Sequence, residues 1–147
     1  MKTYVRCNDP QRVRHAVGEI VWATVGNFLE KRDCNRKPRP VVILQPQRCQ
    51  HSIVGLTTQA RCKGNGELRS VMPTRGICGL CGTSFLWSPR PSRVCRLDVR
   101  SHIGWVNHDL VDVIERDVWC PSHVIDALRR VADEHGCGRS LGACSAS

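Results

Sequence analysis

The sequence has no long hydrophobic run. Hydrophobic residues make up 41% of its 147 positions, but they occur in short stretches, none of which approaches the roughly 20 apolar residues that span a bilayer. Residues 1–10 also lack the apolar core of a secretory signal. We therefore expect a cytoplasmic protein with no membrane association, and the length predicts a single compact domain.

Acidic residues are scarce beside basic ones. The chain has 13 Asp and Glu against 22 Lys and Arg, which gives a formal net charge of +9 with histidine neutral. Such a balance attracts polyanions and speeds their encounter with the protein. We therefore expect nucleic acid or an acidic protein as the partner, and the alternative is a basic surface without a specific ligand.

Cysteine, in contrast, is abundant. The ten cysteines would suit a disulfide framework only in an exported chain, and the missing secretory signal argues against one. The cysteine content is also below that of a disulfide scaffold. Most of the cysteines are therefore expected to be reduced, either buried as small apolar residues or bound to metal.

Cys78 and Cys81 are spaced as in one half of a zinc knuckle, with glycines beside them. A redox role is disfavoured because this pair lies among glycines and prolines rather than at the start of a helix. The alternatives are a structural zinc ion that folds this segment and two buried, unpaired cysteines. A second CxxC pair is absent, so a zinc site would need scattered ligands such as Cys49, His51, Cys62 or Cys95.

Apolar residues in the first two thirds of the chain follow strand patterns. The run at 20–25 predicts a strand buried on both faces, and the charged, proline-ended segment 26–38 predicts a long exposed loop. The segment 73–91 is rich in Gly and Pro and is interpreted as an irregular insertion. Turn signals separate the further expected strands, which predicts a barrel or a sandwich; these strands are 41–45, 52–58, 68–72, 92–99 and 103–106.

The apolar period changes to that of a helix near the C-terminal end. One short apolar face is formed around Leu110 and Ile114, and a second by Val124, Leu128 and Val131. Ser122 is expected to cap the second helix, which would stop near residue 136. The resulting organisation is an N-terminal extension over 1–16, one domain over 17–135 that contains the insertion, and a small, polar tail over 136–147 that is expected to be disordered.

Three short polar motifs at the edges of apolar runs carry a resemblance to a known family. Arg39-Pro40 precedes the run 41–44, Leu56-Thr57-Thr58 follows Ile53 and Val54, and Arg96-Leu97-Asp98 follows Val94. In this order, and following an expected strand at 18–23, the three motifs resemble those of the PemK/MazF family of toxin endoribonucleases. The resemblance implies a mainly β fold, a small SH3-like antiparallel barrel with one or two C-terminal α-helices, and RNA as the substrate.

The resemblance also implies an activity and partners. Family members cut RNA at selected sequences without a metal, by attack of the 2′-hydroxyl, and leave a cyclic phosphate and a 5′-hydroxyl end. They work as homodimers and are inhibited by an acidic antitoxin protein. The positions that match the family's catalytic site are Arg39, Thr57, Arg96 and Asp98.

Two positions depart from the family pattern. Pro38 stands where the family often has an acidic residue before Arg-Pro, and the first loop lacks the histidine that some members use for proton transfer. The general acid therefore stays open among Arg39, His51 and His102.

The residue types at the four matching positions suit metal-free RNA cleavage, which needs an activated 2′-hydroxyl, charge neutralisation on the phosphate and a proton for the leaving oxygen. Arg39 and Arg96 are expected to converge on one phosphate, since a guanidinium stays charged and binds two oxygens. Asp98 lies two residues after Arg96, which on a strand places both on one face and makes the carboxylate a candidate base. Thr57 is a candidate donor to the same phosphate. The structural alternative is a surface ion pair and an ordinary strand threonine.

Basic residues with an aromatic neighbour are the expected RNA contacts outside the catalytic site. Trp87 is the candidate for base stacking, although tryptophans are more often core residues. The expected RNA-binding residues are Arg36, Lys37, Arg61 and Trp87. The runner-up function is a non-catalytic barrel that binds nucleic acid or protein, stapled by zinc, and a zinc-dependent nuclease is the third alternative.

Overall fold

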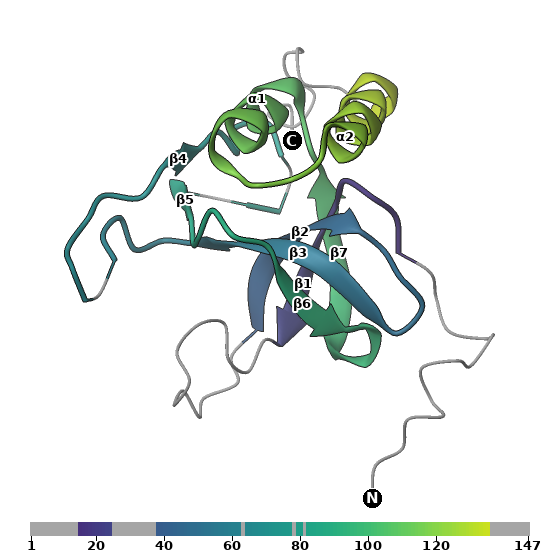
Figure 1. Cartoon of the computed structure of the whole chain (residues 1–147), viewed down its shortest axis with the longest axis horizontal. Helices are drawn as coiled ribbons and strands as arrows, with labels where there is room; N and C mark the ends of the chain where they lie inside the picture. Colours follow the sequence, from purple (N-terminus) through teal and green to yellow (C-terminus); the bar gives the residue numbers. More distant parts are fainter. Residues whose placement is uncertain (1–14, 25–37, 63, 78, 81, 136–147) are drawn as a thin grey trace, which may run out of the picture.

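The computed structural model describes residues 15–24, 38–62, 64–77, 79–80 and 82–135. These residues form a curled antiparallel sheet with two C-terminal helices (Figure 1). This confirms the expected mainly β architecture. The elements are β1 (Glu19–Thr24), β2 (Pro38–Gln45), β3 (Gln50–Thr57), β4 (Val71–Met72), β5 (Ser84–Leu86), β6 (Ser92–Cys95), the 3-10 turn η2 (Arg96–Asp98), β7 (Val99–Trp105), α1 (His108–Asp117) and α2 (Ser122–His135).

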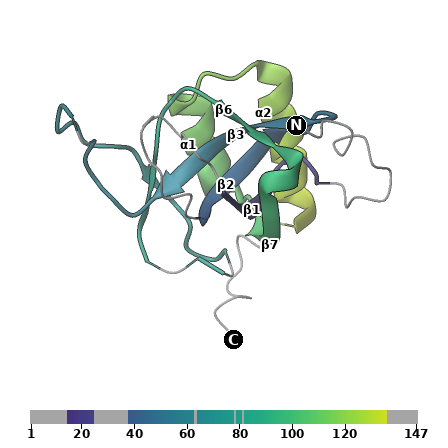
Figure 2. The same ribbon diagram turned by 90° about the horizontal axis from the view of Figure 1, so that it is seen from below.

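The sheet has the strand order β4-β5-β3-β2-β1-β7, and β6 pairs separately with β3. β1 lies between β2 and the edge strand β7, because its Ala23 pairs with Arg39 of β2 on one side and with Val99 of β7 on the other. Seen from below, β1, β2 and β3 lie in front of the two helices (Figure 2). Within the described part of the chain, no helix has the length and apolar character needed to cross a membrane.

Apolar side chains pack on both faces of the central strands, as the run at 20–25 predicts. On one face, Ile20, Val42 and Leu44 join the buried side chains of both helices in the larger core. The other face, inside the curl, holds a smaller core. Its buried members are Val21, Ala23, Val41, Ile43, Ile53 and Val94. Burial of this apolar surface is the main force that holds the curled sheet and the helices together.

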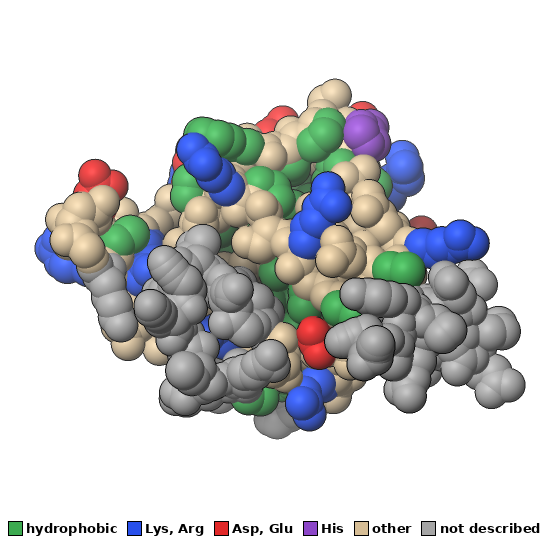
Figure 3. Space-filling model, turned by 60° about the horizontal axis from the view of Figure 1, so that its bottom comes forward, with side chains coloured by type: hydrophobic (Ala, Val, Ile, Leu, Met, Phe, Trp, Pro, Cys, Tyr) green, Lys and Arg blue, Asp and Glu red, His purple; other side chains and the backbone are tan. Residues whose placement is uncertain are grey.

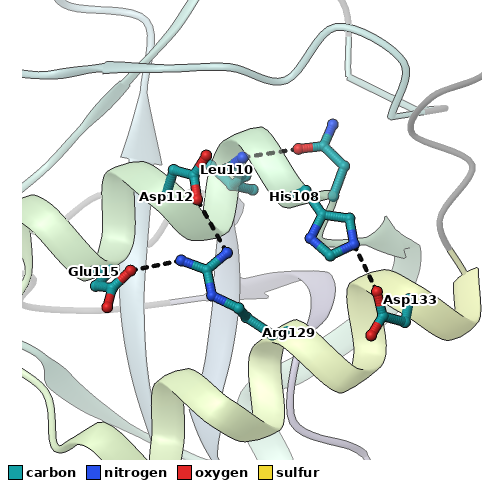
Figure 4. A network of polar contacts seen from close by, with 7 residues as sticks. His108, Leu110, Asp112, Glu115, Arg129 and Asp133 are labelled. Carbon is teal, nitrogen blue, oxygen red and sulfur yellow. Dashed lines mark hydrogen bonds and ion pairs between the residues drawn. The ribbon is translucent and has the colours of Figure 1, made fainter.

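The helices are fixed by capping and by polar bridges between them (Figure 4). The Asn107 side chain accepts a hydrogen bond from the Leu110 N–H at 2.8 Å, which caps α1. Arg129 of α2 contacts Asp112 and Glu115 of α1, and His108 of α1 contacts Asp133 of α2. Such exposed pairs add little stability, so they mainly set the alignment of the two helices. Ser122 is the first residue of α2 rather than its cap, and the helix ends at His135.

The prediction of one continuous strand over 92–99 is wrong. β6 stops at Cys95, whose Sγ accepts a hydrogen bond from the Leu97 N–H at 3.4 Å, and η2 follows. The break is needed because β6 pairs with β3, whereas β7 pairs with β1. The expected strand at 103–106 is the second part of β7.

The predictions for 68–72 and for an irregular 73–91 are also wrong in part. Only Val71 and Met72 form a strand there, and β5 arises within the expected insertion, where Phe85 pairs with Val71. Gly79 has φ +95°, and a Cβ at this position would lie 2.7 Å from Ile103 Cγ2. The absence of a side chain therefore lets this segment pack closely on β7. The segment 25–37, which includes most of the expected loop, lies outside the described residues, as does the tail 136–147.

Candidate functional site

The structure gives the two predicted catalytic arginines different surroundings. Arg39 lies near the start of β2, where the pairing of Val41 with Gly55 brings it to the Thr57 end of β3. Arg96 lies beside the other end of β3, where its backbone N–H donates to the Cys49 carbonyl at 2.8 Å. An eight-residue strand spans about 23 Å when straight. The positions of the two arginines in the sheet therefore do not support the expected convergence on one phosphate.

Arg96 and Asp98 do not share a strand face, which corrects a second expectation. Both residues belong to η2, and in a 3-10 turn residues two apart differ by about 120° around the axis. Asp98 is exposed, whereas Arg96 is partly buried. Thr57 is buried, and its hydroxyl accepts a hydrogen bond from the Gln59 N–H at 3.1 Å. Thr57 therefore shapes the chain that leaves β3.

At the Arg39 end, a tryptophan is covered by two arginines. The guanidinium carbons of Arg39 and Arg69 lie 5.0 and 4.7 Å from the centroid of the Trp87 ring. Arg69 also donates to the carbonyls of Gln59 and Arg61, which ties the chain after β3 to Trp87. The structure thus gathers Arg61, Trp87 and Arg39 in one region, with Arg69 as a member that the sequence motifs did not indicate. Arg36 and Lys37 lie outside the described residues.

Near the other end of β3, the nearly buried carboxylate of Glu19 contacts the exposed imidazole of His102. Glu19 is 8% exposed, and its Oε2 lies 2.9 Å from His102 Nδ1. Its Oε1 accepts a hydrogen bond from the Ala16 N–H at 3.0 Å and lies 3.5 Å from His15 Nδ1. The His102 side chain is 46% exposed. If Nδ1 of the neutral ring donates to Glu19, Nε2 carries the lone pair and can accept a proton.

His51 lies next to this carboxylate group but is closed off from solvent. It is 2% exposed, and its Nδ1 accepts a hydrogen bond from the Gln47 N–H at 3.2 Å. Its ring centroid is 5.8 Å from that of His15. Burial, then His15 and Arg96, lower the pKa of His51 to about 4. The ring is therefore neutral at pH 7.

The acid–base group, defined as His15, Glu19, His51, Arg96 and His102, comes from four separate segments. Of these residues, only Arg96, His51 and His102 are candidates for catalysis from the sequence. The sequence position of Glu19 could have marked it as a site residue. A carboxylate beside a strand that is buried on both faces needs a partner, because an unpaired buried charge is costly. The histidines carry no such signal, since they meet only through folding.

Two further expectations from the sequence concern a metal site and a basic surface. Among the described residues, no group of three or more His, Cys, Asp or Glu is arranged to hold a metal ion. Cys78 and Cys81 lie outside the described residues, so the zinc prediction stays a prediction. Lys and Arg side chains are spread over the face shown in Figure 3 rather than gathered in a single patch. On this face, the charge of the described residues therefore does not mark a single site.

Comparison with known proteins adds no assignment to these two arrangements. No model of a protein family matches the chain, and none of the curated proteins matches it. We therefore infer the function from the chemistry of the residues themselves.

Proposed function

We propose that the protein is a metal-independent endoribonuclease of the PemK/MazF toxin type, which cuts RNA at selected sequences by 2′-hydroxyl attack. The observation that carries the proposal is the Glu19–His102 contact of 2.9 Å, in which a nearly buried carboxylate orients a half-exposed imidazole. This is the arrangement of a general base and its orienting group. The net charge of +9 favours a polyanion, and the resemblance to the PemK/MazF family favours RNA among polyanions.

His102 is the proton acceptor in this mechanism. Its Nε2 takes the proton of the 2′-hydroxyl while Glu19 stabilises the imidazolium that forms, and the 2′-oxygen attacks the adjacent phosphate. Glu19 is itself held by the Ala16 N–H, so the ring does not reorient during proton transfer. His15 also contacts Glu19, but its side chain is only 11% exposed, so in this mechanism the departing 5′-oxygen takes its proton from solvent water.

Arg96 provides positive charge near the same group. Its field reaches His51, whose pKa it helps to lower, so it acts on the acid–base group rather than on the Trp87 region. A guanidinium remains charged and stabilises the negative phosphorane-like transition state. In this proposal Arg39 serves RNA binding rather than chemistry, Thr57 shapes the chain that leaves β3, and Asp98 is not the base. An acidic antitoxin and a homodimer belong to the proposal through the family resemblance.

The test compares two histidine variants on an unstructured RNA in EDTA. His102→Ala is expected to slow cleavage at least about 100-fold, since general acid–base groups contribute on that order. His123→Ala is the matched control, because His123 is exposed and its ring contacts Gln45 rather than Glu19. Fragment ends should be cyclic phosphate and 5′-hydroxyl. Equal cleavage by His102→Ala and wild type would contradict the assignment.

The second candidate is a barrel that binds nucleic acid without cutting it. It is favoured by the separation of Arg39 from Arg96 and by the two arginines on Trp87. This candidate predicts salt-sensitive binding of RNA with no new ends, in wild type and His102→Ala alike.

A further inference from the structure

A second tryptophan–arginine pair lies beside the first. Trp119 follows α1 and is 63% exposed, and the guanidinium carbon of Arg90 lies 4.8 Å from its ring centroid. The backbone N–H of Trp119 donates to the Pro89 carbonyl at 2.9 Å, which fixes the backbone of Trp119 next to that of Arg90. The ring is therefore held in place at its base while most of its surface faces solvent.

The short segment 87–90 connects this pair to Trp87. The Trp87 N–H donates to the Gly55 carbonyl at 2.9 Å, and its own carbonyl accepts from Arg69 Nε at 3.4 Å. Arg39 and Arg69 lie over the Trp87 ring. We call the combined feature the arginine–tryptophan surface. Its members are Arg39, Arg69, Trp87, Arg90 and Trp119.

Arg39 and Arg90 keep their charge available, whereas Arg69 donates to the carbonyls of Gln59, Arg61 and Trp87. Within the described residues, none of Arg39, Arg69 and Arg90 forms an ion pair, whereas the nearby Asp117 is paired with Arg116 at 2.9 Å. Trp119 is 63% exposed and gains only part of the burial energy of a core tryptophan, so the core alone does not explain why it is held in this position. Planar rings with guanidinium groups beside them provide stacking faces and phosphate contacts together.

We propose that the arginine–tryptophan surface binds single-stranded RNA, with an unpaired base stacked on Trp119 and the neighbouring phosphates held by Arg90 and Arg39. Bases in a duplex are already stacked and paired, so this surface discriminates against double-stranded RNA. The proposal rests on the RNA binding of the proposed function and deepens it by naming the stacking residue and the state of the strand, and the binding requires neither His102 nor Arg96. It holds whether or not the bound strand is cut.

The experiment measures binding of a fluorescently labelled, 2′-O-methylated single strand of 12 nucleotides by anisotropy. The methyl group removes the attacking hydroxyl, so the strand stays intact and binding is separated from cleavage. Removing one base-stacking ring costs about 1–3 kcal/mol, so Trp119→Ala is expected to weaken binding about tenfold. Arg90→Ala is expected to weaken binding and to reduce its dependence on salt.

Arg130→Ala is the control for charge, because Arg130 is an exposed arginine on α2 and its loss changes the net charge by the same amount as Arg90→Ala. The proposal predicts that this variant binds like wild type and that a duplex of the same sequence binds at least tenfold more weakly than the single strand. Unchanged binding by Trp119→Ala, or equal binding of the duplex, would overturn it. Binding of a poly-glutamate peptide that depends on Trp119, with no such dependence for RNA, would identify a protein-docking surface instead.

Discussion

Acid should destabilise the folded protein through His51, and the size of the effect follows from its burial. The pKa of His51 is lowered from 6.5 to about 4 in the folded state. Between these two values the unfolded chain binds more protons than the folded one, so stability is lost as pH falls below 6.5. Each unit of pKa difference corresponds to 1.36 kcal/mol, so His51 alone should remove about 2 kcal/mol by pH 5 and about 3 kcal/mol by pH 4.

The variant that isolates this effect is His51→Asn. The Asn side chain oxygen can replace Nδ1 as the acceptor for the Gln47 N–H, and it does not titrate. Removal of the ring lowers stability at every pH, so the informative quantity is the change of unfolding free energy with pH rather than its absolute value.

Urea unfolding followed by tryptophan fluorescence between pH 7 and pH 4 measures this change for both proteins. Carboxylates and the other histidines titrate in both and cancel in the comparison. The wild type should lose about 3 kcal/mol more than His51→Asn over this range. Parallel pH profiles would refute the reasoning, because they would mean that His51 is protonated as easily in the folded chain as in the unfolded one.

Two further predictions test positioning at the acid–base group and packing at β7. Glu19→Gln presents an amide N–H to His102 Nδ1, and this favours the tautomer with the proton on Nε2. RNA cleavage should therefore fall about 100-fold while RNA binding is unchanged. A pH profile of cleavage identical to that of wild type would contradict this role. Gly79→Ala should destabilise the fold by about 1–3 kcal/mol in urea unfolding, because φ is +95° and the new Cβ would lie 2.7 Å from Ile103 Cγ2. Gly76→Ala is its control, with φ +87° and no atom within 4 Å of the new Cβ, and an equal loss in both variants would show that close packing is not the cause.

Sequence patterns predicted the elements whose signals are local. The run at 20–25 predicted β1 with two buried faces, and the spacing of Val124 and Leu128 predicted α2, since each apolar period reflects the element's own geometry. β5 was missed because three residues carry too short a period, and they form a strand only where β3 and β4 offer edges. The break at η2 was missed because β6 and β7 belong to different neighbours in the sheet.

The candidate site was predictable only in part, for a similar reason. Arg96 and His102 were recognised as chemically suitable residue types, but their roles depend on which partners folding brings near them. Glu19 and His102 lie on neighbouring strands, where Glu19 pairs with Trp105 and Val21 with His102. No local pattern contains that register. Two short motifs that share a residue type, such as Arg39 and Arg96, need not share a site.

The alternation along β1 also protects the protein from misassembly. Glu19 faces the acid–base group, and the next residue, Ile20, packs in the core beneath the helices. A shift of β1 by one residue against β2 would exchange these faces, so that a carboxylate would enter an apolar core while an isoleucine met three histidines. Such a misfolded state would lose stability and would also lose the arrangement of the acid–base group. The same two adjacent residues therefore fix both the pairing of β1 and the Glu19–His102 contact.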